Sequence, residues 1–436
     1  MENSLSPLAK VRADLLTCSP RLLAKAALEK SNRNASRNVY LSLDPDRTLA
    51  EADVLEKRFP DKANRPALFG VPIAVKDCFD IAGFRTSCGS RFYAEKNGIA
   101  GADSAVVTRL RQAGAVIVGK THLHQLAYGI TGENADYGDC LQPADAKLLT
   151  GGSSSGSAAS VQEGSAIAAI GTDTGGSIRA PAALCGLAGY RASIGFGRWQ
   201  GSAHLAPSFD TVGWLFQDLR DAPLLASALF DVEQIAPPAN VRVTVVEGSF
   251  LEECEPAVMR VYRGWQERLH TSGAELRGVE PDFWGDSLEI FAGIQAHEAA
   301  KIHQGYFQEF EPVITERLAW GASLSTKTID ALRERHVEFQ RRMDQLLGSD
   351  GFLIVPCAQM SRLFAGADNS SVRKTILRYT TPISLAGMPV ITLPGSEGGV
   401  QLVGNRGSDS QLLAAAAMLG EKLVQEQGAP QPSLRR

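Results

Sequence analysis

The sequence lacks the features that mark several broad classes of protein. Its seven cysteines are scattered, with no C-x-x-C pair, so reduced thiols are expected rather than a disulfide framework. The formal net charge is −4, which provides no basic field for a nucleic acid or an anionic membrane. No apolar run reaches the ~18 residues of a membrane-spanning helix, and the N-terminal MENSLSPLAKVRADLL has no apolar signal core. We therefore expect a cytoplasmic protein with neither nucleic acid nor membrane as a partner.

Metal and nucleotide motifs are missing as well. His122 and His124 form the one close histidine pair, and no acidic third ligand stands near them in the sequence. Neither G-x-x-x-x-G-K-[ST] nor G-x-G-x-x-G occurs. The sequence therefore predicts no metal and no cofactor.

The order of helical and strand patterns predicts an α/β fold. Residues 5–58 carry Leu, Ala and Val at helical spacing. The short apolar segments 71–75 and 115–120 are typical of buried strands, and the pattern between them, 103–112, is helical. This strand–helix–strand rhythm is typical of helices packed on a sheet.

The second half of the chain begins with a change in composition. Residues 220–345 are richer in Glu, Arg and Gln and contain long amphipathic helical stretches at 288–310 and 324–347. Short apolar strands then return in GFLIVPCAQ and MPVITLP, QLLAAAAMLGEKLVQ predicts a closing helix, and 428–436 shows no structural pattern. We predict one α/β domain with a mixed twisted β-sheet flanked by helices on both faces. Its parts are the N-terminal helices (1–60), a catalytic core (65–220 and 350–420) and a variable substrate-cap segment (220–345), within a single domain of 1–436.

Two loops rich in Gly and Ser are the densest runs of small residues, TGGSSSGSAAS from Thr150 and GTDTGGSIR from Gly171. Such loops allow positive φ and expose backbone N–H groups to a ligand. The second loop lies between a predicted strand (166–170) and a predicted helix (178–184). Its amides can therefore converge on one point, which suits the oxyanion of an acyl transfer and would equally suit a phosphate. These amides belong to Thr174, Gly175, Gly176 and Ser177.

A nucleophilic serine in these loops needs a base. Lys76 ends the apolar strand GVPIAV, an unusual place for a lysine. It can act as a base only if burial or a positive neighbour keeps it neutral. From its position alone, a surface turn in which Lys76 pairs with Asp77 or Asp80 remains the alternative.

The segments GVPIAVKD, GGSSSGSAA and GTDTGGSIRAPAALCGLAGYR together resemble the amidase signature family. The resemblance covers roughly 65–220 and 350–420. It implies that Lys76 is the base, that Ser153 is a bridging serine after a cis peptide bond from Gly152, and that Ser177 is the nucleophile. It also implies the amidase signature fold and an amidohydrolase that cleaves the C–N bond of a small linear carboxamide through an acyl-enzyme. The oxyanion hole would be the amides of residues 174–177, and a homodimer is possible.

The same resemblance implies supporting roles. Ser154 would hydrogen-bond within the site. Asp173 and Arg179 would brace the loops, a role compatible with a buried structural ion pair. Thr131, Gly132, Glu133 and Asn134 match a loop at the edge of the pocket and are expected to border the substrate, although Glu133 would serve equally as a solvated turn residue.

Helical spacing within 220–345 marks a further group of residues. They could face the pocket, but helix packing or surface positions are favoured for them. They are Phe291, Gln295, Glu298 and His303.

Four alternatives are considered. Gly152–Gly156 fits the G-x-S-x-G nucleophile elbow with Ser154 as nucleophile, but the polar, proline-broken CLQPADAKLLT before it does not predict the required strand. Within the family, the chain could be a urea- or carbamate-type (biuret-like) hydrolase, or the glutaminase subunit of a tRNA-dependent amidotransferase. The stretches AYGITGENADYGD and HLAPSFDTVGWLFQD are similar to those of shorter members, such as indole-3-acetamide and biuret-type hydrolases. A non-catalytic binding protein is disfavoured because Lys76, Ser153 and Ser177 are all present.

Overall fold

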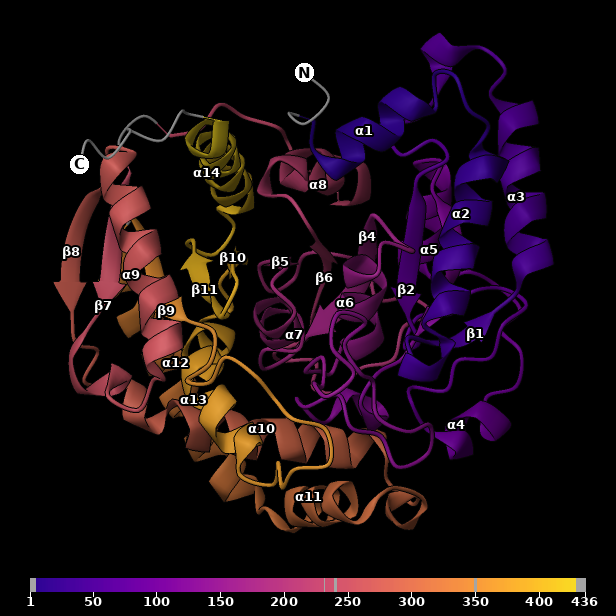
Figure 1. Cartoon of the computed structure of the whole chain (residues 1–436). Coiled ribbons are helices and arrows are strands. Elements are labelled where there is room, and N and C mark those ends of the chain that lie inside the picture. The colour runs from indigo at the N-terminus through magenta and orange to yellow at the C-terminus, as the bar shows by residue number, and fades with distance from the viewer. Residues whose placement is uncertain (1–4, 231, 239–240, 349–350, 429–436) are drawn as a thin grey trace.

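The computed structural model describes residues 5–230, 232–238, 241–348 and 351–428. Of the predicted unstructured tail, 429–436 lies outside these residues. The described chain forms one mixed sheet of 11 strands with helices on both faces (Figure 1). The strands are β1 (Tyr40–Leu43), β2 (Pro72–Lys76), β3 (Val116–Thr121), β4 (Ala168–Asp173), β5 (Ala188–Arg191), β6 (Thr211–Phe216), β7 (Arg242–Val246), β8 (Glu275–Val279), β9 (Gly351–Pro356), β10 (Val390–Gly395) and β11 (Gly398–Val403).

The α-helices precede, separate and follow these strands along the chain. They are α1 (Pro7–Asp14), α2 (Pro20–Arg33), α3 (Pro45–Arg58), α4 (Arg91–Lys96), α5 (Ala105–Gln112), α6 (Ser155–Gln162), α7 (Arg179–Leu184), α8 (Ala222–Phe230), α9 (Pro256–Thr271), α10 (Ser287–Ile302), α11 (Pro312–Ser323), α12 (Thr326–Leu347), α13 (Val372–Ala386) and α14 (Asp409–Gly428). The Ser104 hydroxyl accepts the Val107 N–H and so caps α5, as expected for a serine before an amphipathic helix.

The strand order is β1-β3-β2-β4-β6-β5-β10-β11-β9-β7-β8. Strand β2 runs parallel to β3 and β4, and β7 runs parallel to β8 and β9. The strands between these two groups pair antiparallel. The prediction of a mixed sheet is confirmed.

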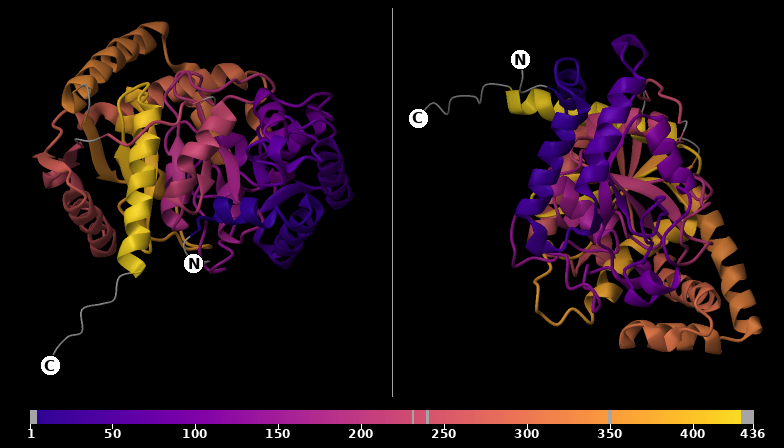
Figure 2. Two further views of the ribbon diagram at one scale, coloured as in Figure 1. Left: turned by 90° about the horizontal axis from the view of Figure 1, so that it is seen from above. Right: turned by 90° about the vertical axis from the view of Figure 1, so that its right-hand side faces the viewer.

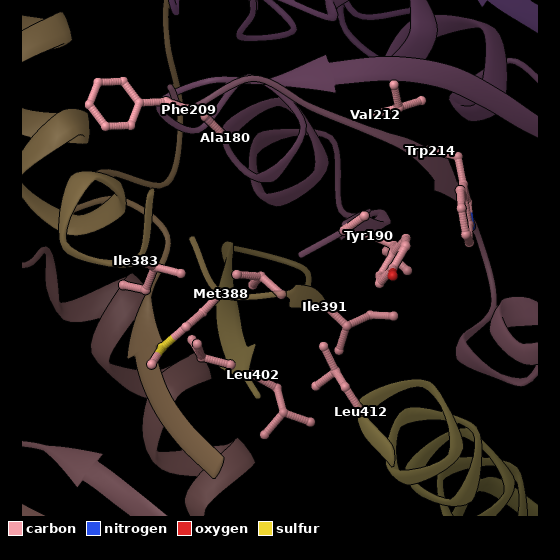
Figure 3. Close-up of a cluster of buried hydrophobic side chains, with 14 of the residues drawn as sticks. Ala180, Tyr190, Phe209, Val212, Trp214, Ile383, Met388, Ile391, Leu402 and Leu412 are labelled. Atoms are coloured by element: carbon pink, nitrogen blue, oxygen red, sulfur yellow. The ribbon is translucent and has the colours of Figure 1, made fainter. Parts of the chain in front are cut away.

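Alternate residues of the central strands enter different cores. Ala74 packs in a cluster with residues of α6 and α7, whereas its neighbours Ile73 and Val75 join the larger cluster that includes residues of α5, α8 and α14. This is the period of two that places successive strand side chains on opposite faces. Figure 3 shows part of the larger cluster, where Tyr190 lies beside Trp214 and pairs across the strands with Ile391.

Six of the strands were not predicted from the sequence: β1, β5, β6, β7, β8 and β11. Strand β1 lies at one edge of the sheet, within a stretch that was expected to be helical. Strands β7 and β8 lie at the other edge, within 220–345. Strands β1 and β8 are partly exposed, so they bury few apolar side chains and carry little alternating pattern. The segment 220–345 thus adds strands to the main sheet as well as helices.

The remaining helices of that segment, α10, α11 and α12, form a group at one end of the molecule (Figure 1 and Figure 2). The predicted helix over 288–310 ends earlier, at Ile302, and His303 caps it. Helix α10 also contacts α13, whose Thr380 hydroxyl donates to the Gly175 carbonyl, so this group is connected to the second Gly/Ser loop. Among the described residues, no helix is long and apolar enough to cross a membrane.

Candidate active site

Lys76 is completely buried at the end of β2. Its Nζ donates hydrogen bonds to the hydroxyls of Ser153 at 2.8 Å, Ser154 at 3.0 Å and Thr172 at 2.7 Å. Asp77 instead pairs with Lys120, whose Nζ lies 2.6 Å from its carboxylate. The surface-turn alternative for Lys76 is therefore wrong: β2 is central in the sheet, and its last side chain points into a network of hydroxyl groups.

The surroundings of Lys76 disfavour its charged form. Burial lowers the pKa of Lys76 to about 8, although Cys78, Asp173 and Asp210 oppose the change by stabilising the ammonium. A lysine of ordinary pKa, about 10.4, would be almost fully protonated near neutral pH. The amine of Lys76 is thus partly neutral in the mildly alkaline range and can accept a proton there.

The first Gly/Ser loop contacts Lys76 through the hydroxyls of Ser153 and Ser154. The peptide bond between Gly152 and Ser153 is cis. The Gly152 N–H donates to the Ile130 carbonyl at 2.7 Å, and the Ser153 carbonyl accepts the His124 N–H at 3.2 Å. The Ser154 N–H donates to the Ser177 carbonyl at 3.1 Å, so the two Gly/Ser loops contact each other directly.

Ser154 does not have the geometry of a nucleophile elbow. Its side chain is fully buried, and its hydroxyl donates to the Thr172 carbonyl at 3.2 Å. In the described chain, residues 139–153 before it form turns and isolated bridges but no strand. The elbow alternative lacks both the strand and the exposed serine that it needs.

The second Gly/Ser loop is organised by the Asp173 carboxylate. Asp173 accepts the backbone N–H groups of Gly176 at 2.8 Å and Ile178 at 3.0 Å, and the Arg179 guanidinium at 2.9 Å. Burial alone would raise the pKa of Asp173, but the guanidinium groups of Arg179 and Arg191 outweigh it and hold the pKa well below its usual range. Asp173 and Arg179 thus form a buried ion pair that also braces the loop.

The contacts of Asp173 change the expected oxyanion hole. The Gly176 N–H, one of the four amides assigned to it, is already donated to Asp173 because the side chain folds back over its own loop. Outside the strand and helix ladders, the described residues offer no acceptor to the amides of Gly175 and Ser177. The free donors of this loop are therefore expected among Thr174, Gly175 and Ser177.

Both glycines of this loop are required by close packing. A Cβ atom on Gly175 would lie 2.6 Å from the Phe291 ring, and one on Gly176 would lie 2.9 Å from the Thr380 hydroxyl. Gly176 also has a φ of 126°, which side chains other than glycine rarely adopt. Phe291 therefore packs against this loop.

Ser177 lies at the end of this loop and is 5% exposed. In the part of the chain that the structure describes, no other group forms a hydrogen bond with its hydroxyl. Its carbonyl links it to the Ser154 loop, so the structure brings Lys76, Ser153 and the Ser177 loop into one region.

Thr172 and Asp210 were not among the predicted site residues. Thr172 bonds Lys76 directly, and the Asp210 carboxylate accepts the Thr174 hydroxyl at 2.6 Å. Asp210 also lies 3.0 Å from His204 Nδ1, and the His204 ring stacks on Trp199 at 4.3 Å. Thr172 could have been found from the register, because β2 and β4 are parallel neighbours. Asp210 carries no such signal, because its carboxylate reaches the loop through tertiary packing.

The predicted pocket-edge loop borders a cavity of about 510 Å³. Thr131, Glu133 and Asn134 line it, whereas Gly132 packs against the Gly151 carbonyl. Glu133 accepts the Thr131 hydroxyl at 2.7 Å and the Asn369 amide at 3.1 Å, so it is not a solvated turn residue. The Asn134 amide donates to two backbone carbonyls and orders the loop.

The predicted helical group lies on α10, except for His303, which follows its last residue, Ile302. Phe291 contacts Gly175, and the Gln295 side chain accepts the Arg373 guanidinium at 2.8 Å. Glu298 instead accepts the Ser208 N–H at 3.0 Å and so packs structural elements. His303 Nδ1 lies 2.8 Å from the Tyr93 hydroxyl, and His303 also lines a small cavity with Thr172 and Thr174. Within the described ranges, no three His, Cys, Asp or Glu side chains cluster so as to hold a metal ion.

Replacing Arg179 with alanine is expected to lower the free energy of unfolding by about 3–5 kcal/mol, because it removes the nearer cation of the buried Asp173 carboxylate and leaves only Arg191, 3.6 Å away. Urea unfolding followed by circular dichroism measures this change. Arg341→Ala, which removes an exposed pair with Glu338, is the control and should cost less than about 1 kcal/mol. Equal effects of the two variants would contradict the role assigned to Arg179.

Comparisons with known proteins bear on the family to which the chain belongs. The family profile described as Amidase matches residues 23–413. A glutamyl-tRNA(Gln) amidotransferase subunit from Neisseria meningitidis serogroup C / serotype 2a is 30% identical over 443 residues, which covers 88% of this chain and 90% of that protein. A crystal structure of an amidase matches with a TM-score of 0.86 at 28% identity, covering 96% of this chain and 100% of that one.

A second solved structure is described as a vestigial protein complex that reveals the evolutionary origins of an s-triazine catabolic enzyme. It matches with a TM-score of 0.82 at 27% identity and covers 94% of this chain and 96% of that one. The profile match, the full-length structural likeness and the two Gly/Ser loops gathered around Lys76 lead to one conclusion. The chain belongs to the amidase signature family.

Proposed function

We propose that this protein is an amidohydrolase that cleaves the C–N bond of a small linear carboxamide through an acyl-enzyme on Ser177. The observation that supports it most strongly is the 2.8 Å contact between Lys76 Nζ and Ser153 Oγ, made by a fully buried lysine with a lowered pKa. Such a pair provides the base that a serine nucleophile needs.

In this mechanism the Ser177 hydroxyl attacks the amide carbonyl carbon. Its proton passes to Ser153, and the Ser153 proton passes to neutral Lys76. The oxyanion accepts hydrogen bonds from the free backbone N–H groups of the Thr174–Ser177 loop. When the C–N bond breaks, the proton returns through Ser153 to the leaving nitrogen. Water then attacks the acyl-enzyme while Lys76 again takes up a proton through Ser153. As the bond to Ser177 Oγ breaks, that proton returns through Ser153 to Ser177, and the carboxylic acid is released.

The same steps would hydrolyse a urea or a carbamate, because these substrates also present a carbonyl bonded to nitrogen. They are therefore the first alternatives within this proposal. We also propose that the protein is cytoplasmic and acts on a small-molecule substrate. A homodimer is its expected assembly.

A second function is favoured by the curated relatives. Proteins similar to this chain include subunits of glutamyl-tRNA(Gln) amidotransferases, and the alignment covers 90% of one of them. In that case the same serine would hydrolyse glutamine, and the ammonia would pass to a partner protein. Glutamine would then be the preferred amide, and hydrolysis would increase when the partner is added.

Ammonia release by the purified protein tests both proposals. The substrates are aliphatic and arylalkyl primary amides, ureas and glutamine, each at the same concentration. Release from amides or ureas by the protein alone supports the amidohydrolase, and release confined to glutamine supports the amidotransferase role. No release from any of them would contradict the first proposal.

The pH dependence of kcat/KM is expected to rise with an apparent pKa of about 8, the pKa of Lys76. Below that pH the amine is protonated and cannot accept the proton from Ser153, so activity should fall about tenfold per pH unit. Above it the amine is neutral and activity should level off. Initial rates between about pH 6 and about pH 10 measure this profile. A flat profile across the range would contradict Lys76 as the base.

A further inference from the structure

A small cavity adjoins the second Gly/Ser loop. Its volume is about 20 Å³, which is room for one group the size of a water molecule. Thr172, which bonds Lys76 Nζ at 2.7 Å, and Thr174, the first residue assigned to the oxyanion hole, both line it. The cavity therefore lies within one side chain of the assigned base and beside the loop that would hold the reacting carbonyl.

His303 brings an unpartnered polar atom to this cavity. The residue is 5% exposed, and its Nδ1 lies 2.8 Å from the hydroxyl of Tyr93, which does not line the cavity. Its Nε2 is buried and has no hydrogen-bond partner among the described residues. The hydroxyls of Thr172 and Thr174 and the carboxylate of Asp210, which also line the cavity, are all bonded. In the part of the chain that the structure describes, His303 Nε2 is thus the one buried nitrogen or oxygen of the lining side chains without a partner.

The contact with Tyr93 decides which nitrogen of His303 carries the proton. Burial raises the pKa of Tyr93 to about 12, so its hydroxyl keeps its proton, and that hydroxyl has no other hydrogen-bond partner among the described residues. It therefore donates to Nδ1, which leaves the proton of the neutral imidazole on Nε2. Burial also lowers the pKa of His303 to about 4, so the ring is uncharged near neutral pH. His303 thus presents one N–H donor and no charge to the cavity.

The rest of the wall favours a small uncharged group. Most of the other lining side chains are apolar or aromatic, namely Leu123, Leu126, Ala127, Trp199, Ala203 and Leu205. Leu126 and Ala127 have φ values of 55° and 56°, a backbone strain that concentrates at ligand sites. A buried donor without an acceptor is costly. The cavity is therefore suited to a group that accepts a hydrogen bond from His303.

We propose that His303 is a specificity-determining residue whose Nε2–H donates a hydrogen bond to an uncharged oxygen atom of the substrate in this cavity. This inference rests on the proposed amidohydrolase function. The substrate would be a short amide whose oxygen-bearing end lies beside Thr174 while its amide group lies at the Ser177 loop. An amide with a methyl group in place of that oxygen would leave the His303 donor unpaired, and a bulkier end would not fit.

The test uses pairs of primary amides in which a hydroxyl replaces the terminal methyl group. The pairs are glycolamide with propanamide, 3-hydroxypropanamide with butanamide, and 4-hydroxybutanamide with pentanamide. In the pair whose length matches the distance to His303, we expect kcat/KM to be at least about tenfold higher for the hydroxyamide, because only its oxygen pairs the buried donor.

Two substitutions separate the two ring nitrogens of His303. His303→Gln can place an amide N–H near the position of Nε2, whereas His303→Asn places its amide near Nδ1, where it reaches Tyr93. The preference for the hydroxyamide should be kept in part by His303→Gln and reduced by about tenfold in His303→Asn. His270→Gln changes an exposed histidine of α9 and should leave the preference unchanged. A preference kept by His303→Asn and lost in His303→Gln would mean that His303 acts only through Tyr93, which would overturn the proposal.

Binding is measured separately from catalysis, by NMR of the histidine ring nitrogens in isotope-labelled Ser177→Ala. The His303 signals are identified by their loss when His303→Gln is added. At least one of the hydroxyamides should shift the Nε2 signal, and its methyl counterpart should not. If this shift occurs but no amide is hydrolysed, the His303 site stands and the proposed function fails. If amides are hydrolysed, but no pair favours the hydroxyamide and no shift occurs, the His303 site is wrong and the amidohydrolase stands.

Discussion

Replacing Ser177 with alanine is expected to lower kcat/KM for the preferred amide by about 10⁴-fold or more, because loss of a nucleophile removes the covalent route entirely. Ser177 is nearly buried, and the change removes one oxygen atom from a loop that Asp173 holds through backbone amides. The fold should therefore be preserved. Steady-state ammonia release measures the loss, and the melting temperature checks the fold.

The control is an exposed serine away from the Gly/Ser loops. Ser323, at the end of α11, donates its hydroxyl to the Trp320 carbonyl, and Ser323→Ala should keep wild-type activity. Ser154→Ala should be affected less than Ser177→Ala, because Ser154 orders Lys76 and Thr172 but is not the assigned nucleophile. A Ser154→Ala variant that loses everything, beside a Ser177→Ala variant that keeps its turnover, would reverse these two roles.

Removing the amine of Lys76 is expected to lower kcat by about 10²–10⁴-fold, the usual contribution of a general base. Lys76→Ala also leaves a cavity at the end of β2, so Lys76→Met is the sharper variant: it fills similar space and has no group that accepts a proton. Both variants should lose the activity rise near pH 8 that is assigned to Lys76. A Lys76→Met enzyme with near-normal turnover and an unchanged pH profile would contradict the assignment.

The melting temperature of Lys76→Met shows whether its loss of activity comes from unfolding. Because Lys76 is completely buried, replacing its amine by a thioether removes the cost of desolvating a charge. Lys76→Met should therefore unfold at a temperature similar to or above that of the wild type. A large drop in melting temperature would show that the amine serves mainly to hold the hydroxyls of Ser153, Ser154 and Thr172.

Much of the site could be predicted because it depends on local sequence. Lys76 ends an apolar strand, and the glycines at 175 and 176 mark a loop whose backbone must approach its surroundings closely. These features follow from the pattern of a few consecutive residues. The family resemblance then added the roles of Ser153 and Ser177, which spacing alone left open.

What could not be predicted depends on packing between distant segments. Arg373 and Gln295 meet because α13 lies against α10, and neither residue belongs to a recognisable motif. The edge strands β1 and β8 escaped prediction because an edge strand with one open side needs little apolar pattern. The Gly176 amide was assigned to the oxyanion hole because the side-chain direction of Asp173 cannot be deduced from a sequence.

Intact-protein mass spectrometry after treatment with a fluorophosphonate tests the central claim most directly. The wild type should gain one adduct, Ser154→Ala should still be labelled, and Ser177→Ala should not be labelled. Peptide mapping should place the adduct on Ser177. Labelling that persists in Ser177→Ala and disappears in Ser154→Ala would contradict the assignment of Ser177 as the nucleophile.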